Sequence, residues 1–179
     1  MKEIQYKIKG VTPILFHNVY TMDLIKPKKM THSEFEQSDE VFKSRVYFED
    51  NKLVLPPRVI LGLLKNASAK SGIKQDGKRA TYSSIIRAII FVLDSMFLDQ
   101  NFDDLERHRE YVTVQRSKIL RIFPMLKQWS GILNLTYDET QISEEALTEI
   151  LIYGGSFVGM GDYRPLYGRF SVEKIKRKK

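Results

Sequence analysis

The sequence predicts an α+β domain of the modified ferredoxin-like type, in which an antiparallel sheet carries two main helices on one face. Three observations predict it. Alternating strands occur near both ends of the chain, amphipathic helical patterns lie between strands, and about forty residues near the N-terminus have no sustained period. A length of 179 residues fits one domain. We therefore expect a single domain over 1–173, an insertion at about 17–51 and a basic tail at 174–179.

The first half of the chain contains one clear strand and one clear helix. Residues 3–9 alternate between apolar and polar side chains, which is typical of a half-buried strand. Pro57 suits a first helical position, and apolar residues recur after it at helical spacing, which predicts a helix over 55–70. We expect a flexible basic loop over 71–80. A short helix over 81–87 followed by a buried strand fits the next residues, but periodicity does not separate helix from strand in so apolar a stretch.

The second half contains more strands and a second helix. Ser143 is a suitable N-cap for a helix that would end at Gly154 as its C-cap. Residues 101–110 are expected to form a charged connector, and Pro124 is expected to end the strand before it. Strands are predicted over 111–123, 129–137 and 166–173.

Composition excludes several classes of protein. The chain has no cysteine, so thiolate zinc sites, iron–sulfur clusters, disulfides and cysteine nucleophiles are excluded. Neither a signal-peptide core nor an apolar run long enough for a membrane helix is present, so we expect no membrane partner and a cytoplasmic location. We expect no cofactor and no metal. The carboxylates Asp99, Asp103, Asp104 and Glu106 lack the spacing of a calcium loop and are interpreted as a solvated connector.

Positive charge is unevenly distributed along the chain. The formal net charge is +7, and most of this excess lies in the final residues, 174–179. Within the body, residues 58–87 carry seven cationic side chains against a single acidic one, Asp76. Segregated positive charge favours an anionic polymer as partner, and a solvated basic face is the alternative.

The most distinctive segment is rich in glycine and runs from Gly154 to Phe170. Successive backbone N–H groups in such a segment can form a nest for an anion. It does not match a mononucleotide P-loop or a dinucleotide-binding fingerprint. The alternative is a tight connection whose arginines are merely solvated. We expect Tyr167 and Arg169 to point outward from the uncovered face of the sheet, where they would contact a nucleic acid.

Two segments resemble the RAMP proteins, the repeat-associated RNA-binding proteins of CRISPR systems. Residues 55–65 look like the element that opens the first helix of that family, and residues 154–170 are similar to its glycine-rich loop and closing strand. The strand at 4–8 and the residues at 11–16 have the expected positions. Pro57 and Arg58 depart from the usual small residues, which indicates a divergent relative. The phrase 161–170 is also similar to phage proteins.

The resemblance implies that the chain binds RNA or single-stranded DNA, largely without regard to base identity. The host would be a bacterial or archaeal cell, and a phage origin stays open. Phosphates would be bound by arginine and lysine, the backbone would approach at glycine, and bases would stack on tyrosine. The expected nucleic-acid-binding residues are Arg58, Lys65, Lys78, Arg79, Arg116, Lys118, Arg121, Gly159, Gly161, Tyr163, Arg164, Tyr167 and Arg169.

Two other functions stay open. By resemblance to the family's processing enzymes, the chain would be a metal-independent endoribonuclease, with His17 or His32 as general base. Asp23 lies where some relatives carry a target-cleaving aspartate. A third reading is an assembly protein that docks an acidic CRISPR or phage protein. The resemblance also implies a homo-oligomer that lines up along the nucleic-acid strand.

Overall fold

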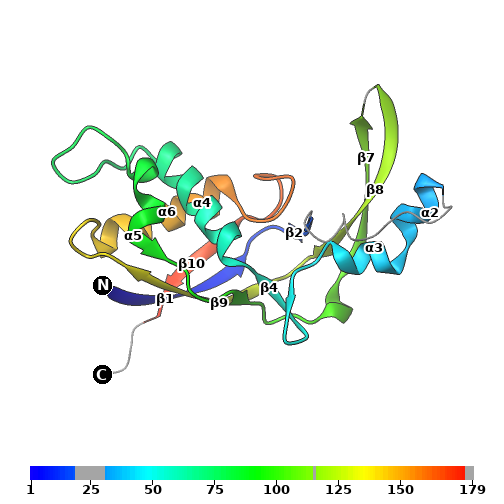
Figure 1. Cartoon of the computed structure of the whole chain (residues 1–179), viewed down its shortest axis with the longest axis horizontal. Helices are drawn as coiled ribbons and strands as arrows, with labels where there is room; N and C mark the ends of the chain where they lie inside the picture. Colours follow the sequence, from blue (N-terminus) through cyan, green and yellow to red (C-terminus); the bar gives the residue numbers. More distant parts are fainter. Residues whose placement is uncertain (19–30, 115, 176–179) are drawn as a thin grey trace.

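A computed structural model describes residues 1–18, 31–114 and 116–175. Its largest sheet is antiparallel and has the strand order β10-β1-β9-β5. The bounds of these strands are β1 (Lys2–Gly10), β5 (Ile90–Phe91), β9 (Ser130–Tyr137) and β10 (Phe170–Lys174). In Figure 1 this sheet lies in the lower left part of the molecule, and a long hairpin projects upward at the right. In the described ranges, no helix is long and apolar enough to cross a membrane.

Alternation in β1 divides the sheet into a buried and an exposed set of side chains. Ile4, Tyr6 and Ile8 are buried, whereas Lys7 and Lys9, at alternate positions, are exposed. The buried set shares one hydrophobic core with inward residues of β9 and with the two longest helices, α4 (Pro57–Lys70) and α6 (Glu144–Tyr153). The strands expected at 3–9 and 129–137 are therefore confirmed.

The helix α4 follows the apolar spacing of its sequence. Pro57 stands at its start, and Ile60, Leu63, Leu64 and Ala67 are all buried. The basic loop after it ends in a one-turn helix η1 (Tyr82–Ser84) and in α5 (Ile86–Ile89), and β5 continues for only two residues. The expected helix and short helix are confirmed, and the buried strand after them is much shorter than its apolar run.

The second predicted helix begins and ends at the expected caps, Ser143 and Gly154, but the chain stays helical beyond its end. Ser143 Oγ accepts a hydrogen bond from the N–H of Ala146 at 3.1 Å, as an N-cap does. Gly154 is not a left-handed C-cap: its φ of −56° is helical, and the chain continues into a π turn, η3 (Gly154–Val158). The left-handed glycine stands five residues later, at Gly159, whose φ is 76°.

A long hairpin replaces the expected connector and single strand. It consists of β7 (Glu106–Val114) and β8 (Ser117–Leu126), which pair along their whole length. The prediction of a connector over 101–110 is wrong, because only the turn η2 (Phe102–Asp104) precedes β7. The turn of this hairpin could not be recognised from the sequence, because its left-handed residue, with a φ of 69°, is Arg116 and not glycine.

Pro124 lies inside β8 and does not end it. Its carbonyl accepts a hydrogen bond from the N–H of Phe16 at 2.9 Å. The N–H and C=O of one strand residue point to the same side, so the missing N–H faces the strand β2 (Ile14–Leu15). β2 ends at Leu15, opposite Met125. The proline is therefore tolerated because it costs no hydrogen bond on the β7 side.

The insertion contains regular structure that the sequence pattern did not show. Its helices are α2 (His32–Gln37) and α3 (Asp39–Ser44), and a small sheet of order β3-β4-β6 follows. The strands of that sheet are β3 (Phe48–Glu49), β4 (Lys52–Leu55) and β6 (Met96–Phe97). Six-residue helices are too short for a periodic pattern to identify, which explains why this segment was expected to be irregular.

A buried ion pair fastens the insertion to the hairpin. Glu36 of α2 and Arg45 just after α3 are both fully buried, and the two side chains form a double hydrogen bond of 2.7 and 2.8 Å. Glu36 also accepts from the Ile122 N–H at 3.1 Å and from Arg121 at 3.0 Å. Burial alone would raise the pKa of Glu36, but the hydrogen bonds from Arg45 and Ile122 and the two positive charges lower it.

The last strand starts later than expected. The prediction placed it over 166–173, but β10 begins at Phe170. Tyr167 and Arg169 therefore do not project from the sheet. The reason is local, because Gly168, with a φ of 74°, interrupts the extended conformation just before β10.

We predict that Glu36→Gln destabilises the fold by about 3 kcal/mol at pH 7, because Arg45 then stays buried without a counter-charge. A carboxylate with a lowered pKa stabilises the folded state above its ordinary pKa of about 4.3, and this contribution is lost as the pH falls through the folded value. The difference between wild type and variant should therefore shrink at acidic pH. Urea unfolding at pH 7 and at acidic pH measures it.

The matched control is Glu40→Gln, which removes an exposed carboxylate from the neighbouring helix. It should leave the urea midpoint nearly unchanged. Equal midpoints for Glu36→Gln and Glu40→Gln at pH 7 would show that the buried pair does not hold the insertion.

Candidate nucleic-acid interface

A small pocket gathers residues that lie far apart in the sequence. It has a volume of about 170 Å³. It is lined by residues 15–17, by Tyr47 and Leu55, by the first turns of α4 and by the glycine-rich segment. In Figure 1 they meet in the middle of the molecule, between the helical body and the hairpin β7–β8. The polar lining residues are His17, Tyr47, Arg58, Asn66, Asp162 and Arg164.

Backbone contacts hold the glycine-rich segment against β2. The N–H of Asp162 donates to Leu15 O at 2.9 Å, and the N–H of Gly168 donates to Pro13 O at 2.7 Å. Gly161 has a φ of 81°, and a Cβ at this position would lie 2.5 Å from the Leu15 oxygen. Only glycine permits this approach. The glycines therefore serve to bring the next side chain, Asp162, beside His17.

His17 and Asp162 form a pair at the edge of the pocket. His17 Nδ1 lies 3.0 Å from Asp162 Oδ2, although the two residues are 145 positions apart. The His17 hydrogen bond lowers the pKa of Asp162, burial opposes this, and the N–H of Tyr163 and the charge of Arg164 lower it further. Asp162 is thus held as a carboxylate that accepts a hydrogen bond from His17 Nδ1. The other ring nitrogen of His17, Nε2, takes no part in this contact.

Arg58 reaches the same pocket from the first turn of α4. Its guanidinium lies over the ring of Tyr47 at 4.9 Å, and its Nη2 is 3.4 Å from Asn18 Oδ1. Arg164 is exposed and lines the same pocket from the glycine-rich segment. Two arginines, a histidine and one carboxylate therefore surround a single small cavity, which suits a bound phosphate more than a metal ion.

The other expected cations are distributed over the molecule. Lys65 is exposed on α4, about two turns beyond Arg58. Lys78 and Arg79 lie in the loop after α4, at the far end of the body from the glycine segment (Figure 1). Arg116 and Lys118 are exposed at the tip of the hairpin β7–β8. Gly159 starts the turn that leads to Gly161.

Three expected contact residues have structural partners. Arg121 is ion-paired with Glu36 at 3.0 Å. Tyr167 is partly buried against Leu15, Phe123 and Met125, and its hydroxyl lies 3.4 Å from His108 Nε2. Arg169 Nε donates to Pro165 O at 2.8 Å, although its side chain is exposed.

Tyr163 keeps part of its ring exposed. It packs edge-on against Phe123, with ring centroids 5.3 Å apart. Its φ of 51° is left-handed, which directs the chain from Asp162 towards Arg164.

Of the remaining catalytic candidates, His32 does not line this pocket. His32 is exposed at the start of α2, where its Nε2 lies 3.3 Å from Leu120 O. Asp23 lies outside the described residues. Among residues 1–18, 31–114 and 116–175, no group of three or more His, Asp or Glu side chains could hold a metal ion.

Sequence reasoning missed Asp162, Asn66 and Tyr47 as members of the site. Asp162 directly follows the glycine that carries the close backbone approach, which is a local signal. Its pairing with His17 has no local signal, because it depends on how the two ends of the chain meet. Asn66 lies two turns after Arg58 on the same side of α4, so helical spacing could have indicated it.

The chain was compared with protein-family models and with curated proteins. No family model matches the chain, and no curated protein matches it. Function must therefore be inferred from the geometry itself.

We predict that Gly161→Ala lowers the free energy of unfolding by about 3 kcal/mol, because a Cβ would meet the Leu15 carbonyl in a backbone conformation that already disfavours alanine. Gly77→Ala is the matched control. Gly77 has a similar φ of 68°, but nothing lies within 4 Å of an added Cβ. Alanine there should therefore lower the free energy of unfolding only by its backbone strain, about 1 kcal/mol. Urea unfolding compares the two, and equal losses would contradict the role of the close approach.

Proposed function

We propose that the chain binds single-stranded nucleic acid, RNA or DNA, with one backbone phosphate seated in the pocket between Arg58 and Arg164. The observation that carries this proposal is the convergence of these two arginines, from segments more than one hundred residues apart, on one cavity. Each guanidinium can donate a pair of parallel hydrogen bonds to phosphate oxygens. Asp162 brings one negative charge to the pocket, which the two positive charges of Arg58 and Arg164 outweigh.

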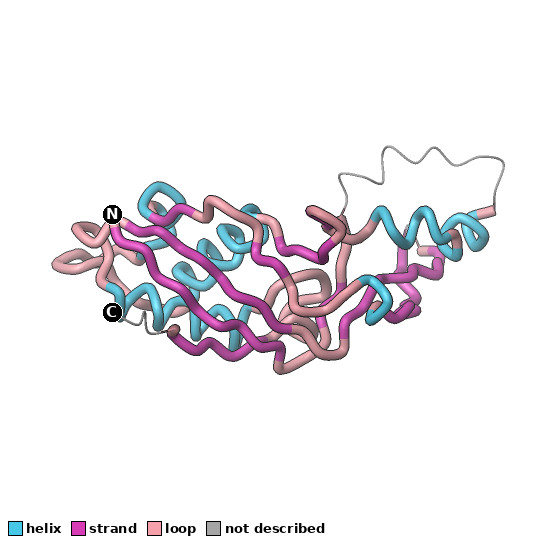
Figure 2. The backbone as a smooth tube through the Cα atoms, turned by 90° about the horizontal axis from the view of Figure 1, so that it is seen from below, coloured by secondary structure: helices cyan, strands magenta, loops and turns pink. Residues whose placement is uncertain are grey.

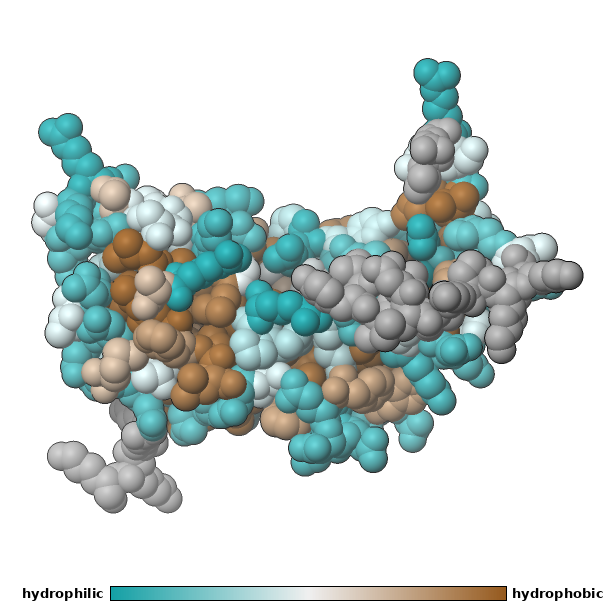
Figure 3. Space-filling view, viewed as in Figure 1, coloured by the Kyte–Doolittle hydropathy of each residue, from teal (hydrophilic) through white to brown (hydrophobic). Residues whose placement is uncertain are grey.

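The shape of the molecule supports a path for the strand. In the space-filling view, which has the orientation of Figure 1, the upper outline dips between two projections, the basic loop after α4 and the tip of the hairpin β7–β8 (Figure 3). Exposed cations lie at both ends of this dip, with Lys78 and Arg79 at one and Arg116 and Lys118 at the other. A flexible polyanion that crosses the pocket would thus meet positive charge on either side.

We propose further that the fold is ferredoxin-like and belongs with the RAMP proteins. The chain order β1, α4, β5, β9, α6, β10 combined with the sheet order β10-β1-β9-β5 supports this assignment. Figure 2 supports it as well, since strands lie nearest the viewer and helices lie behind them. The glycine-rich segment then occupies the connection between the last helix and the last strand.

Arg164→Gln tests the binding proposal. Loss of the Arg164 guanidinium should weaken binding of labelled poly-U or poly-dT about tenfold. It should also reduce the magnitude of the slope of log K against log salt by about 0.7, because one phosphate contact on a single strand is removed. Fluorescence anisotropy over a salt series measures both quantities.

Arg87→Gln is the control, because Arg87 is an exposed arginine on α5 at the opposite end of the body. It should change affinity less than threefold. An equal effect of both variants, or binding that does not respond to salt, would remove the proposal.

A second function is supported by one observation, the 3.0 Å pair of His17 and Asp162 beside the two arginines. In this reading His17 Nε2 takes the proton of a ribose 2′-hydroxyl while Asp162 orients the ring through Nδ1. The 2′-oxygen attacks phosphorus, the bond to the 5′-oxygen breaks, and that oxygen leaves with a proton from solvent. The products are a 2′,3′-cyclic phosphate and a 5′-hydroxyl, and no metal takes part.

Incubation with single-stranded RNA in EDTA tests this second function. We expect cleavage by the wild type and its loss in His17→Ala, with retention in His32→Ala because His32 lies outside the pocket. Asp162→Asn should slow cleavage by about one hundredfold or more, since the orienting carboxylate is lost. Intact RNA with the wild type would leave binding as the function.

A further inference from the structure

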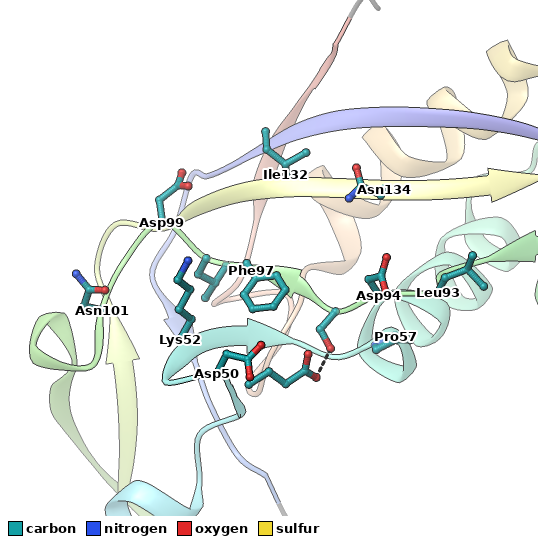
Figure 4. A pocket seen from close by; sticks show the side chains of 13 residues that line it. Asp50, Lys52, Pro57, Leu93, Asp94, Phe97, Asp99, Asn101, Ile132 and Asn134 are labelled. Atoms are coloured by element: carbon teal, nitrogen blue, oxygen red, sulfur yellow. Dashed lines mark hydrogen bonds between the residues drawn. The ribbon is translucent and has the colours of Figure 1, made fainter.

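A second, larger groove lies on the uncovered side of the main sheet. It has a volume of about 850 Å³ and lies between the hairpin β3–β4, residues 93–101 and the outer face of β9 (Figure 4). Large apolar side chains are exposed along it: Leu93 is 77%, Ile132 40% and Phe97 39% exposed. Phe91, 43% exposed, continues this apolar surface into an adjoining groove that also contains Leu93.

Acidic side chains surround the apolar surface. Glu49, Asp50, Asp94 and Asp99 all line the groove, and Lys52 is the one cation among its lining residues. Figure 4 shows Asp99 at one end of the groove, Asp94 at the other and Asp50 beside β4. Such a surface repels phosphate, in contrast to the pocket between Arg58 and Arg164.

Local structure fixes these carboxylates in place. Asp50 and Asn51 form the two-residue turn of the hairpin β3–β4, with φ values of 50° and 59° at the positions where a tight hairpin needs left-handed residues. Glu49 accepts a hydrogen bond from the Ser95 hydroxyl, which is drawn in Figure 4. Asp99 accepts one from the Ser130 hydroxyl. The acidic rim is thus part of the folded hairpin and of the segment that faces it.

We propose that this groove binds a protein partner through a basic segment with a short apolar centre. An apolar floor with a charged rim is the usual anatomy of a protein-binding surface, in which the centre is desolvated and the rim selects the partner by charge. Charge complementarity identifies the occupant, because the rim is negative on a chain whose net charge is +7. This goes beyond nucleic-acid binding and uses none of the residues of the first pocket.

The test uses a fluorescein-labelled heptapeptide with three central leucines flanked by two lysines at each end. A peptide of the same pattern with glutamates in place of lysines is the charge-reversed probe. Wild-type protein should bind the lysine peptide, and the glutamate peptide should bind at least tenfold more weakly. Equal binding of the two peptides, or no binding of the lysine peptide at millimolar protein, would overturn the proposal.

Two variants locate the peptide in the groove. Asp50→Asn with Asp94→Asn should weaken binding of the lysine peptide about tenfold, since two rim charges are lost. Asparagine suits the left-handed backbone of Asp50, so the turn should keep its conformation. Leu93→Ser should also weaken it about tenfold, because an exposed apolar contact is removed.

The matched control, Glu139→Gln with Glu149→Gln, removes two exposed carboxylates elsewhere and should change peptide affinity less than twofold. An equal loss in this control would overturn the proposal. So would self-association of the wild type, seen by light scattering, that Asp50→Asn with Asp94→Asn abolishes, since the occupant would then be a second copy. RNA binding, which depends on Arg58 and Arg164, should not fall in the groove variants, so the two proposals can fail separately.

Discussion

The close backbone contact between the glycine-rich segment and residues 13–15 determines the geometry of the candidate site. Two hydrogen bonds, from Asp162 N–H to Leu15 O and from Gly168 N–H to Pro13 O, hold the segments together at 2.9 and 2.7 Å. A Cβ on Gly161 would lie 2.5 Å from the Leu15 oxygen, so the contact needs bare backbone. Because both segments are fixed, Asp162 has a defined position beside His17, and Arg164 follows it into the pocket wall.

Phe123 of β8 connects this site to the buried ion pair of the insertion. The guanidinium of Arg45, which pairs with Glu36, lies over the Phe123 ring at 5.9 Å. The rings of His17 and Tyr163 pack edge-on against the same phenyl group at 5.6 and 5.3 Å. The insertion is therefore linked through one aromatic ring to His17, which lines the pocket, and to Tyr163, which follows Asp162. Loss of the Glu36 carboxylate should therefore affect the pocket as well as the hairpin.

The sequence could predict the parts of this molecule that repeat a local period. Alternation identified β1 and β9, and helical spacing after Pro57 identified α4. The hairpin β7–β8 was missed because its turn uses Arg116 in a left-handed conformation, and α2 was missed because six residues held by one buried ion pair have no periodic pattern. Site residues such as Arg58 could be named from charge, but the contact between His17 and Asp162 depends on the tertiary structure alone.

Net charge is a poor guide to what each surface of this chain can bind. The value of +7 conceals a division across the uncovered side of the sheet, where Lys7 and Lys9 are exposed on β1 while the groove beside β9 is rimmed by Asp50, Asp94 and Asp99. Potentials at surfaces fall off over about 8 Å at physiological salt, so each surface acts through its own local charge. A polyanion is directed away from the acidic groove, and a basic protein segment is directed towards it. The two proposed partners would therefore use separate residues of the chain.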